Sequence, residues 1–174
     1  YEGGGCAIYA GTTVFDDCII SGNSTSDDGG GIYADAYSSI PSTVTLTGCA
    51  ISSNSASYAG GGIEASDTHL TMIDCDIKLN TSVYDAAGVD IYGTGVTGTV
   101  TNCRFENNSG GDGGGMWTNV PTTLDHCLFA GNSSVQPNSN SYGGGIYIGG
   151  GPLVMTNCTV YDNLAQPYIG GGGD

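Results

Sequence analysis

The chain has 174 residues, of which 17 are acidic and two are basic, so its formal net charge at pH 7 is −15. Such a charge repels nucleic acids and anionic lipid surfaces, and we expect neither as a partner. No apolar run is long enough to span a membrane, and no basic segment followed by an apolar stretch opens the chain. We therefore expect a single domain over residues 1–174, a mature segment or fragment without signal, caps or anchor.

The first predicted unit runs from a glycine cluster to an asparagine. Residues 3–5 are glycines and are followed by Cys6. Phe15 then lies three residues before Cys18, and Asn23 lies five residues after it. Because glycine, cysteine and asparagine occupy set places among apolar residues, the sequence favours an ordered repeat over a flexible low-complexity chain.

The same order recurs five more times along the chain. The glycine clusters, one of them a variant with two alanines, are residues 3–5, 29–31, 60–62, 86–88, 113–115 and 143–145. The cysteines and the asparagines five residues after them are Cys18 and Asn23, Cys49 and Asn54, Cys75 and Asn80, Cys103 and Asn108, Cys127 and Asn132, and Cys158 and Asn163. Successive motif cysteines are 31, 26, 28, 24 and 31 residues apart, so the unit varies in length but keeps its marked positions.

Units of this length, with three short stretches of alternating apolar residues, predict the coils of a parallel β-helix. We expect an all-β, right-handed solenoid of about six coils with three short strands per coil. Equivalent residues would then stack about 4.8 Å apart along the axis. The glycines would form tight corners, the cysteines would fill the narrow core, and the asparagines would bond amide to amide as a structural ladder. On the outer face, Asp76 would lie beside Arg104, and Lys78 beside Glu106.

The repeat resembles that of the polymorphic membrane protein family and of related bacterial surface β-helices. Its "GGGIY" and "FENN" or "FAGN" elements are similar to the GGA[ILV] and FxxN repeats of that family. The resemblance implies a right-handed β-helix that is extracellular or displayed on the cell surface and that is often adhesive. Its partners would be surface glycans or a host or neighbouring cell.

The seven cysteines predict buried free thiols rather than a metal site. No CxxC spacing occurs, and no histidine lies at ligand spacing, so we expect no zinc. Stacked cysteines are also slightly too far apart for easy disulfides. The pair that could form one is Cys6 with Cys18, which would face each other in the first coil.

Two further patterns suggest ligands only weakly. The string "GTGVTG" formally matches a nucleotide-binding GxGxxG but lies within a β-coil, with no helix after it. Aspartates lie close before three glycine clusters and could hold a calcium ion between coils, although the sequence favours their interpretation as acidic loop residues that aid solubility. These calcium candidates are Asp27, Asp28, Asp85 and Asp112. We expect no other cofactor.

Catalysis receives little support from the sequence. Many β-helices cleave polysaccharides, but such sites usually need lateral loops with paired carboxylates or basic residues. The longest insertions, near residues 34–42 and 133–142, contain little beyond Asp35 that could act as an acid or base. His69 and His126 lie on different turns and suit exposed polar positions. We therefore expect no enzyme.

Glycosylation is a separate possibility for a secreted chain. Asn-x-Ser/Thr sequons begin at Asn23, Asn80, Asn107, Asn132 and Asn157. Three of these asparagines belong to the expected ladder, so Asn107 and Asn157 are the candidates for attachment.

Both ends of the chain contain glycine clusters, "YEGGGC" and "YIGGGGD". Open terminal coils expose core residues and strand edges, so either a cap is missing or two ends stack head to tail as a filament. The sequence therefore favours an extracellular structural or adhesive scaffold, such as a fibre or stalk. The alternative is a β-helix that binds or cleaves polysaccharide.

Overall fold

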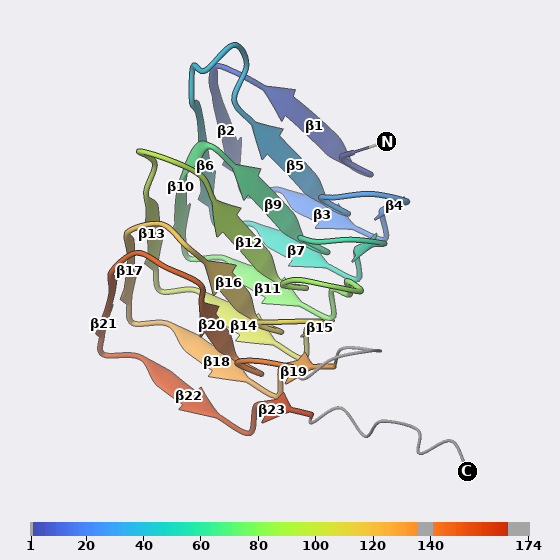
Figure 1. The fold of residues 1–174 in the computed structure, drawn as a ribbon, viewed down its shortest axis with the longest axis vertical. Helices are drawn as coiled ribbons and strands as arrows, with labels where there is room; N and C mark the ends of the chain where they lie inside the picture. The colour runs from blue at the N-terminus through green and yellow to red at the C-terminus, as the bar shows by residue number, and fades with distance from the viewer. Residues whose placement is uncertain (1, 136–140, 167–174) are drawn as a thin grey trace.

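The computed structural model describes residues 2–135 and 141–166 and shows a right-handed parallel β-helix with three strands per coil (Figure 1). The C-terminal glycine cluster and the centre of the 133–142 insertion lie outside the described residues. Within those residues the chain forms strands and turns, and it contains no helix long and apolar enough to cross a membrane. The predicted fold class is confirmed.

Three six-stranded sheets run the length of the solenoid. Sheet 1 consists of β1 (Cys6–Tyr9), β5 (Ile32–Asp35), β9 (Ile63–Ser66), β12 (Val89–Tyr92), β16 (Met116–Thr118) and β20 (Ile146–Ile148). Sheet 2 consists of β2 (Thr12–Asp16), β6 (Ser42–Thr47), β10 (Thr68–Ile73), β13 (Gly98–Thr101), β17 (Thr122–Asp125) and β21 (Leu153–Thr156). Sheet 3 consists of β3 (Ile19–Ser21), β7 (Ala50–Ser52), β11 (Asp76–Lys78), β14 (Arg104–Glu106), β18 (Leu128–Ala130) and β22 (Thr159–Tyr161).

Short strands close five of the six coils between sheet 3 and the next glycine corner, and an isolated bridge at Thr81 takes their place in the third coil. They are β4 (Ser24–Thr25), β8 (Ser55–Ala56), β15 (Ser109–Gly110), β19 (Ser133–Ser134) and β23 (Leu164–Ala165). In Figure 1 they follow one edge of the solenoid, from β4 near the end that carries β1 to β23 near the end that carries β22. All neighbouring strands within the sheets are parallel, so each coil adds one strand to every sheet.

The glycine corner is required by close backbone approach between coils. Gly29 has φ +68°, a conformation that side chains rarely adopt. A Cβ on Gly31 would lie 2.5 Å from the carbonyl oxygen of Gly62, one coil away. Larger residues at this corner would therefore separate the coils.

Apolar side chains from all three sheets meet in a narrow core. Ile32, Leu46 and Ile51 are fully buried in the second coil, and the rings of Phe105 and Phe129 stack with centroids 4.4 Å apart. Cys49, Cys75, Cys103 and Cys127 are buried, whereas Cys6, Cys18 and Cys158 in the end coils are partly exposed. Each buried cysteine lies at the turn between a strand of sheet 2 and the following strand of sheet 3.

The six motif asparagines form one continuous ladder of hydrogen bonds. Asn54 Nδ2 donates to Asn80 Oδ1 at 3.1 Å and to the Ile20 carbonyl at 2.9 Å. Asn80 Oδ1 also accepts the backbone N–H of Asn54 at 3.0 Å. The same amide contacts continue from Asn23 to Asn163. Each buried amide therefore satisfies backbone groups of the adjoining coils.

Candidate functional site

Sheet 1 presents two rows of outward-facing side chains. Its strands begin with an inward apolar residue after the glycine corner, so the second and fourth residues point outward. The strand register aligns the second residues in one row: Ala7, Tyr33, Glu64, Asp90, Trp117 and Tyr147. The other row includes Tyr9 beside Asp35, and Ser66 beside Tyr92. This face therefore combines aromatic rings with carboxyl groups.

The other two faces have a different chemistry. Sheet 2 carries an outward row of threonines, including Thr45, Thr71 and Thr99. On sheet 3, Arg104 lies 2.8 Å from Glu106 and 3.8 Å from Asp76, in exposed ion pairs. The register also aligns Lys78 with Glu106, as the sequence predicted. Neither face collects aromatic side chains as sheet 1 does.

Glu64 and Asp90 are the most unusual residues of sheet 1. They are directly paired on the adjacent strands β9 and β12 and are only 1% and 2% exposed. Glu64 Oε2 and Asp90 Oδ1 are buried without a hydrogen-bond partner. Such unsatisfied buried carboxyl oxygens are costly and need a specific explanation.

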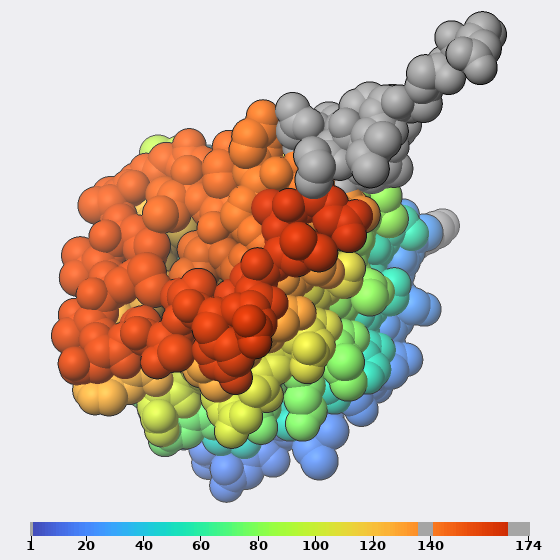
Figure 2. All heavy atoms as spheres, turned by 90° about the horizontal axis from the view of Figure 1, so that it is seen from below, coloured from blue at the N-terminus to red at the C-terminus, as the bar shows by residue number. Residues whose placement is uncertain are grey.

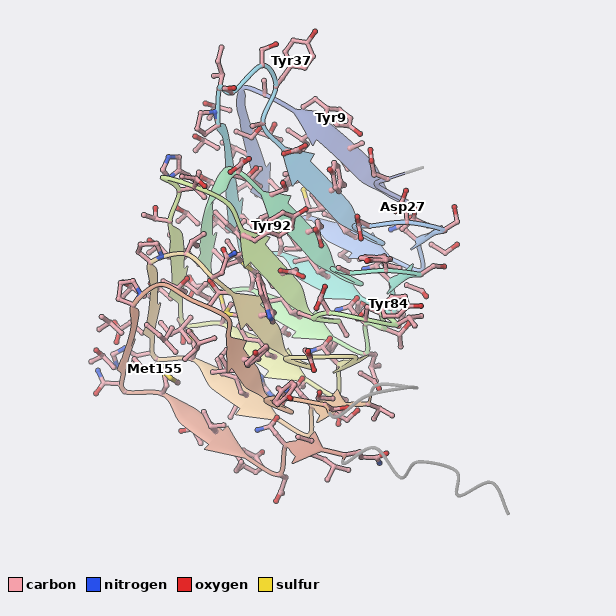
Figure 3. All side chains as sticks on the ribbon, viewed as in Figure 1. Tyr9, Asp27, Tyr37, Tyr84, Tyr92 and Met155 are labelled. Atoms are coloured by element: carbon pink, nitrogen blue, oxygen red, sulfur yellow. The ribbon has the colours of Figure 1, made fainter. Side chains whose placement is uncertain are left out.

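Both carboxyl groups line a pocket of about 240 Å³, which we call the carboxyl pocket. Asp28 and Asp85, from the turns before two glycine corners, complete its acidic lining. Its aromatic lining is Tyr58, Tyr92 and Trp117. Figure 3 shows Tyr92 on β12 and Tyr84 near the edge that carries the short strands. The centroid of the Tyr84 ring lies 4.9 Å from that of the Tyr58 ring. The turn that contains Tyr58 thus extends the pocket beyond sheet 1.

The electrostatics of the carboxyl pocket favour protonated acids. Burial is the main cause that raises the pKa of Glu64 well above its ordinary value, and the charge of Asp28 adds to it. Burial and then the Glu64 charge raise the pKa of Asp90 in the same way. Burial likewise raises the pKa values of Asp28 and Asp85. All four carboxyl groups therefore retain protons to higher pH than in an unfolded chain.

No basic side chain of this protein compensates these acids. Its only lysine and arginine, Lys78 and Arg104, lie on sheet 3. The ring of His69 lies 3.2 Å from the hydroxyl of Thr97, and that of His126 lies 2.9 Å from Asp125. The lining of the carboxyl pocket contains no lysine, arginine or histidine, so a cation from another molecule could serve as partner of its acids.

Asp28 and Asp85 line the same pocket, but in the described part of the chain no three of the calcium candidates lie together. Asp28 Oδ1 accepts the backbone N–H of Ala59, and Asp112 Oδ1 accepts that of Tyr142. Within residues 2–135 and 141–166, no three His, Cys, Asp or Glu side chains are placed to hold a metal ion. Asp27, Asp28, Asp85 and Asp112 therefore form no metal cluster in this part of the chain.

The cysteines are free thiols. Cys6 and Cys18 do not form a disulfide, although both line a hollow of about 380 Å³ in the first coil. The Cys18 thiol instead donates to the carbonyl of Asp16. Cys75 and Cys103 make the same bond to the carbonyls of Ile73 and Thr101, two residues earlier.

The glycosylation candidates occupy exposed turns. Asn107 and Asn157 have φ +55°, in the left-handed region that asparagine tolerates better than most residues. Asn80 and Asn132 are fully buried in the ladder, which removes their sequons from the folded surface. The backbone conformation alone therefore explains why asparagine occurs at positions 107 and 157. Both side chains are nevertheless exposed, so a sugar could be attached to either of them.

The sequence predictions missed Glu64 and Asp90. Asp35, proposed as the only acid in the long insertions, lies on the same face but accepts the neighbouring Ala36 N–H. The signal that would have found the pair is the second position after each glycine cluster, where tyrosine, glutamate, aspartate and tryptophan succeed one another. Their burial depends on Tyr58 and other turn residues, which the repeat does not specify.

Comparison with known proteins gives one family match. The model of the "right handed beta helix region" matches residues 1–96, which is more than half of the chain. No curated protein and no solved structure matches it. The matched segment contains the first three coils and the strands that carry Glu64 and Asp90. Together with three parallel sheets that gain one strand per coil, this match assigns the chain to the right-handed β-helix family.

Proposed function

We propose that this β-helix binds polysaccharide along the outer face of sheet 1. The observation that carries the proposal is the pair of buried carboxyl groups, Glu64 and Asp90, within an aromatic row. Sugar-binding sites need ring faces that stack on the apolar side of a pyranose, and polar groups that receive its hydroxyls. Trp117 and Tyr147 supply such faces on neighbouring coils, and Tyr33 lies in the same row, one coil before Glu64.

Binding has more support than cleavage. The right-handed β-helix family includes both polysaccharide-cleaving enzymes and proteins without such activity. Glycoside hydrolysis needs one protonated carboxyl and one ionised carboxylate, set apart by their environments. Here burial raises the pKa values of both Glu64 and Asp90, and no basic side chain holds either of them ionised. Because the pKa values of both carboxyl groups shift in the same direction, a binding site is favoured over an acid and base pair.

A screen of immobilised oligosaccharides would test the proposal. We expect binding that Trp117→Ala weakens about tenfold, since stacked aromatic rings are frequent binding anchors. Tyr161→Ala, on exposed sheet 3, is the matched control and should leave binding unchanged. If the wild type binds none of the oligosaccharides, the proposal is contradicted. If shorter sugars are released, the protein cleaves polysaccharide instead of only binding it.

A second candidate function is the structural or adhesive scaffold predicted from the sequence. Figure 2 looks onto the last coil, where Met155 and Val160 are 39% and 51% exposed. At the other end, Phe15 and Ile20 line the hollow in the first coil. Contact between two such ends would bury apolar surface and pair open strands, giving a head-to-tail fibre. Sedimentation at rising concentration tests this, because a monomer at every concentration would contradict it.

An extracellular or cell-surface location fits a polysaccharide ligand and is part of this proposal. The similarity to the polymorphic membrane protein repeats supports the same location. We also propose Asn107 and Asn157 as accessible glycosylation positions, since both side chains are exposed in turns. Mass spectrometry of the secreted protein, before and after glycosidase treatment, would detect sugar at either residue.

A further inference from the structure

We propose that the carboxyl pocket binds the protonated amine of an amino-sugar unit, a 2-amino-2-deoxyhexose whose nitrogen carries no acetyl group. This inference rests on the proposed polysaccharide binding and adds the chemical class of the sugar. It starts from the two unpartnered oxygens, Glu64 Oε2 and Asp90 Oδ1, which both belong to the lining of the same pocket.

The arrangement of these two oxygens suits an ammonium group. They come from strands in direct register, and neighbouring strands lie roughly 4.8 Å apart. An ammonium group has three donors that can reach acceptors on separate side chains. A guanidinium group instead prefers both oxygens of one carboxylate in a fork. One open oxygen on each of two carboxyl groups therefore favours the ammonium.

The aromatic lining stabilises the same kind of group. Tyr58, Tyr92 and Trp117 belong to the pocket together with the acids. Aromatic faces attract a cation, most strongly where water is excluded, and they also stack on the ring of a sugar. Asp28 and Asp85 add negative potential to the rim. An amine carried on a pyranose would use both properties.

The size of the pocket favours a single amino-sugar unit over a larger organic ligand, and its lining disfavours a bare metal ion. Its volume of about 240 Å³ is below the roughly 300–1,000 Å³ common for drug-sized ligands, which suits a single sugar unit. A bare metal ion would need several converging oxygen ligands. No such set of three groups occurs in residues 2–135 and 141–166.

Binding would exchange protons for the ligand charge. Without a ligand, burial beside other acids raises the pKa values of Glu64 and Asp90, so both keep their protons to higher pH than exposed acids do. When the ammonium enters, it supplies one positive charge, and one proton leaves the carboxyl pair for solvent, so that the net charge of the pocket is unchanged. No covalent bond to the sugar forms or breaks in this exchange.

Calorimetric titration of the complete chain at pH 6 tests the inference. The probes are a β-1,4-linked glucosamine tetramer, its fully N-acetylated counterpart and putrescine, a diamine without a sugar ring. We expect the glucosamine tetramer to bind about tenfold or more tightly than the acetylated one, since it adds hydrogen bonds between charged groups. Repeating the titration in buffers with different ionisation heats should reveal released protons.

Variants then assign the effect to the two acids. Glu64→Gln with Asp90→Asn should abolish both the preference for the amine and the proton release. The matched control is Asp16→Asn with Asp162→Asn, which replaces two acids by amides at exposed positions and should change neither. Should the double variant fold poorly, Asp90→Asn alone should still reduce the preference several-fold.

The outcomes separate the two proposals. Equal binding of both tetramers by the wild type overturns the amine inference and leaves polysaccharide binding intact. Binding of neither tetramer overturns both. Putrescine binding as tightly as the glucosamine tetramer overturns the assignment to a sugar, because the amine alone would then account for the affinity.

Discussion

Two groups of buried polar side chains in this molecule differ in whether their hydrogen bonds are satisfied. In the interior, Asn80 accepts and donates hydrogen bonds to both adjoining coils. Below the surface of sheet 1, Glu64 and Asp90 are as deeply buried but leave an oxygen each without a partner. A satisfied polar group stabilises the coil stack, whereas an unsatisfied one costs stability and is retained for another reason. The contrast separates the structural ladder from the candidate ligand site.

The largest expected effect comes from breaking the ladder. Asn80→Ala removes the partner of the buried Asn54 N–H and of the Ile51 carbonyl, and it interrupts the amide contacts on both sides. We expect a loss of about 3–5 kcal/mol in the free energy of unfolding, measured by chemical denaturation. Asn107→Gly, in an exposed turn with positive φ, is the control and should change the value by less than about 0.5 kcal/mol. Similar losses in both variants would show that the ladder has no special role.

Replacing Glu64 and Asp90 should raise the free energy of unfolding, by less than the loss of the ladder lowers it. Glu64→Gln with Asp90→Asn removes the tendency of two buried acids to ionise, while keeping their shape. At pH 7 and without ligand, the free energy of unfolding should rise by about 1–2 kcal/mol. Equilibrium denaturation would check this. A clear loss of stability would mean that the two acids serve the fold, as the asparagines do.

The destabilisation caused by the buried acids should depend on pH. Below about pH 4 the two acids are protonated in the folded and the unfolded chain, so they contribute no difference. As pH rises, the unfolded chain releases its protons first, because folding raises the pKa values of Glu64 and Asp90. Stability should therefore fall with rising pH from about pH 4 through the raised pKa values.

The measurement is a series of denaturation curves from pH 4.5 to pH 8. The Glu64→Gln and Asp90→Asn variant should show a flatter decline than the wild type. The Asp16→Asn and Asp162→Asn control corrects for general repulsion in a chain of net charge −15. A decline that is equally steep in all three proteins would refute a special contribution of the pair.

The smallest expected effect concerns the exposed face of sheet 3. Arg104 bonds Glu106 on its own strand at 2.8 Å, and both side chains contact solvent. Glu106→Gln should lower the free energy of unfolding by less than about 1 kcal/mol, as is usual for exposed ion pairs. Denaturation in low and high salt should show this small difference disappearing as salt is added. A loss comparable to that of Asn80→Ala would place this ion pair among the main stabilising contacts.

The sequence predicted the parts of the fold that repeat. The five-residue spacing from cysteine to asparagine located the ladder, and the alignment of units correctly placed Asp76 beside Arg104. These features follow from stacking, which imposes the same residue type on every coil. Repetition therefore made the scaffold predictable from residue types alone.

The candidate site could not be predicted in the same way because it does not repeat. Glu64 and Asp90 follow Tyr33 and precede Trp117 in one outward row, so no residue type recurs to draw attention to the position. Their burial depends on how Tyr58 and its neighbouring turns cover the sheet. Conversely, the aspartates proposed for calcium do recur, but Asp28 and Asp112 bond backbone N–H groups.

The most direct test of the contrast is infrared difference spectroscopy of the carboxyl groups as the glucosamine tetramer is added. Before addition, the wild type at pH 6 should show a protonated carboxyl band that is missing from the Glu64→Gln and Asp90→Asn variant. Binding should convert that band into carboxylate absorption. An unchanged band on binding, or the same change in the variant, would contradict the assignment of these two acids to a ligand site.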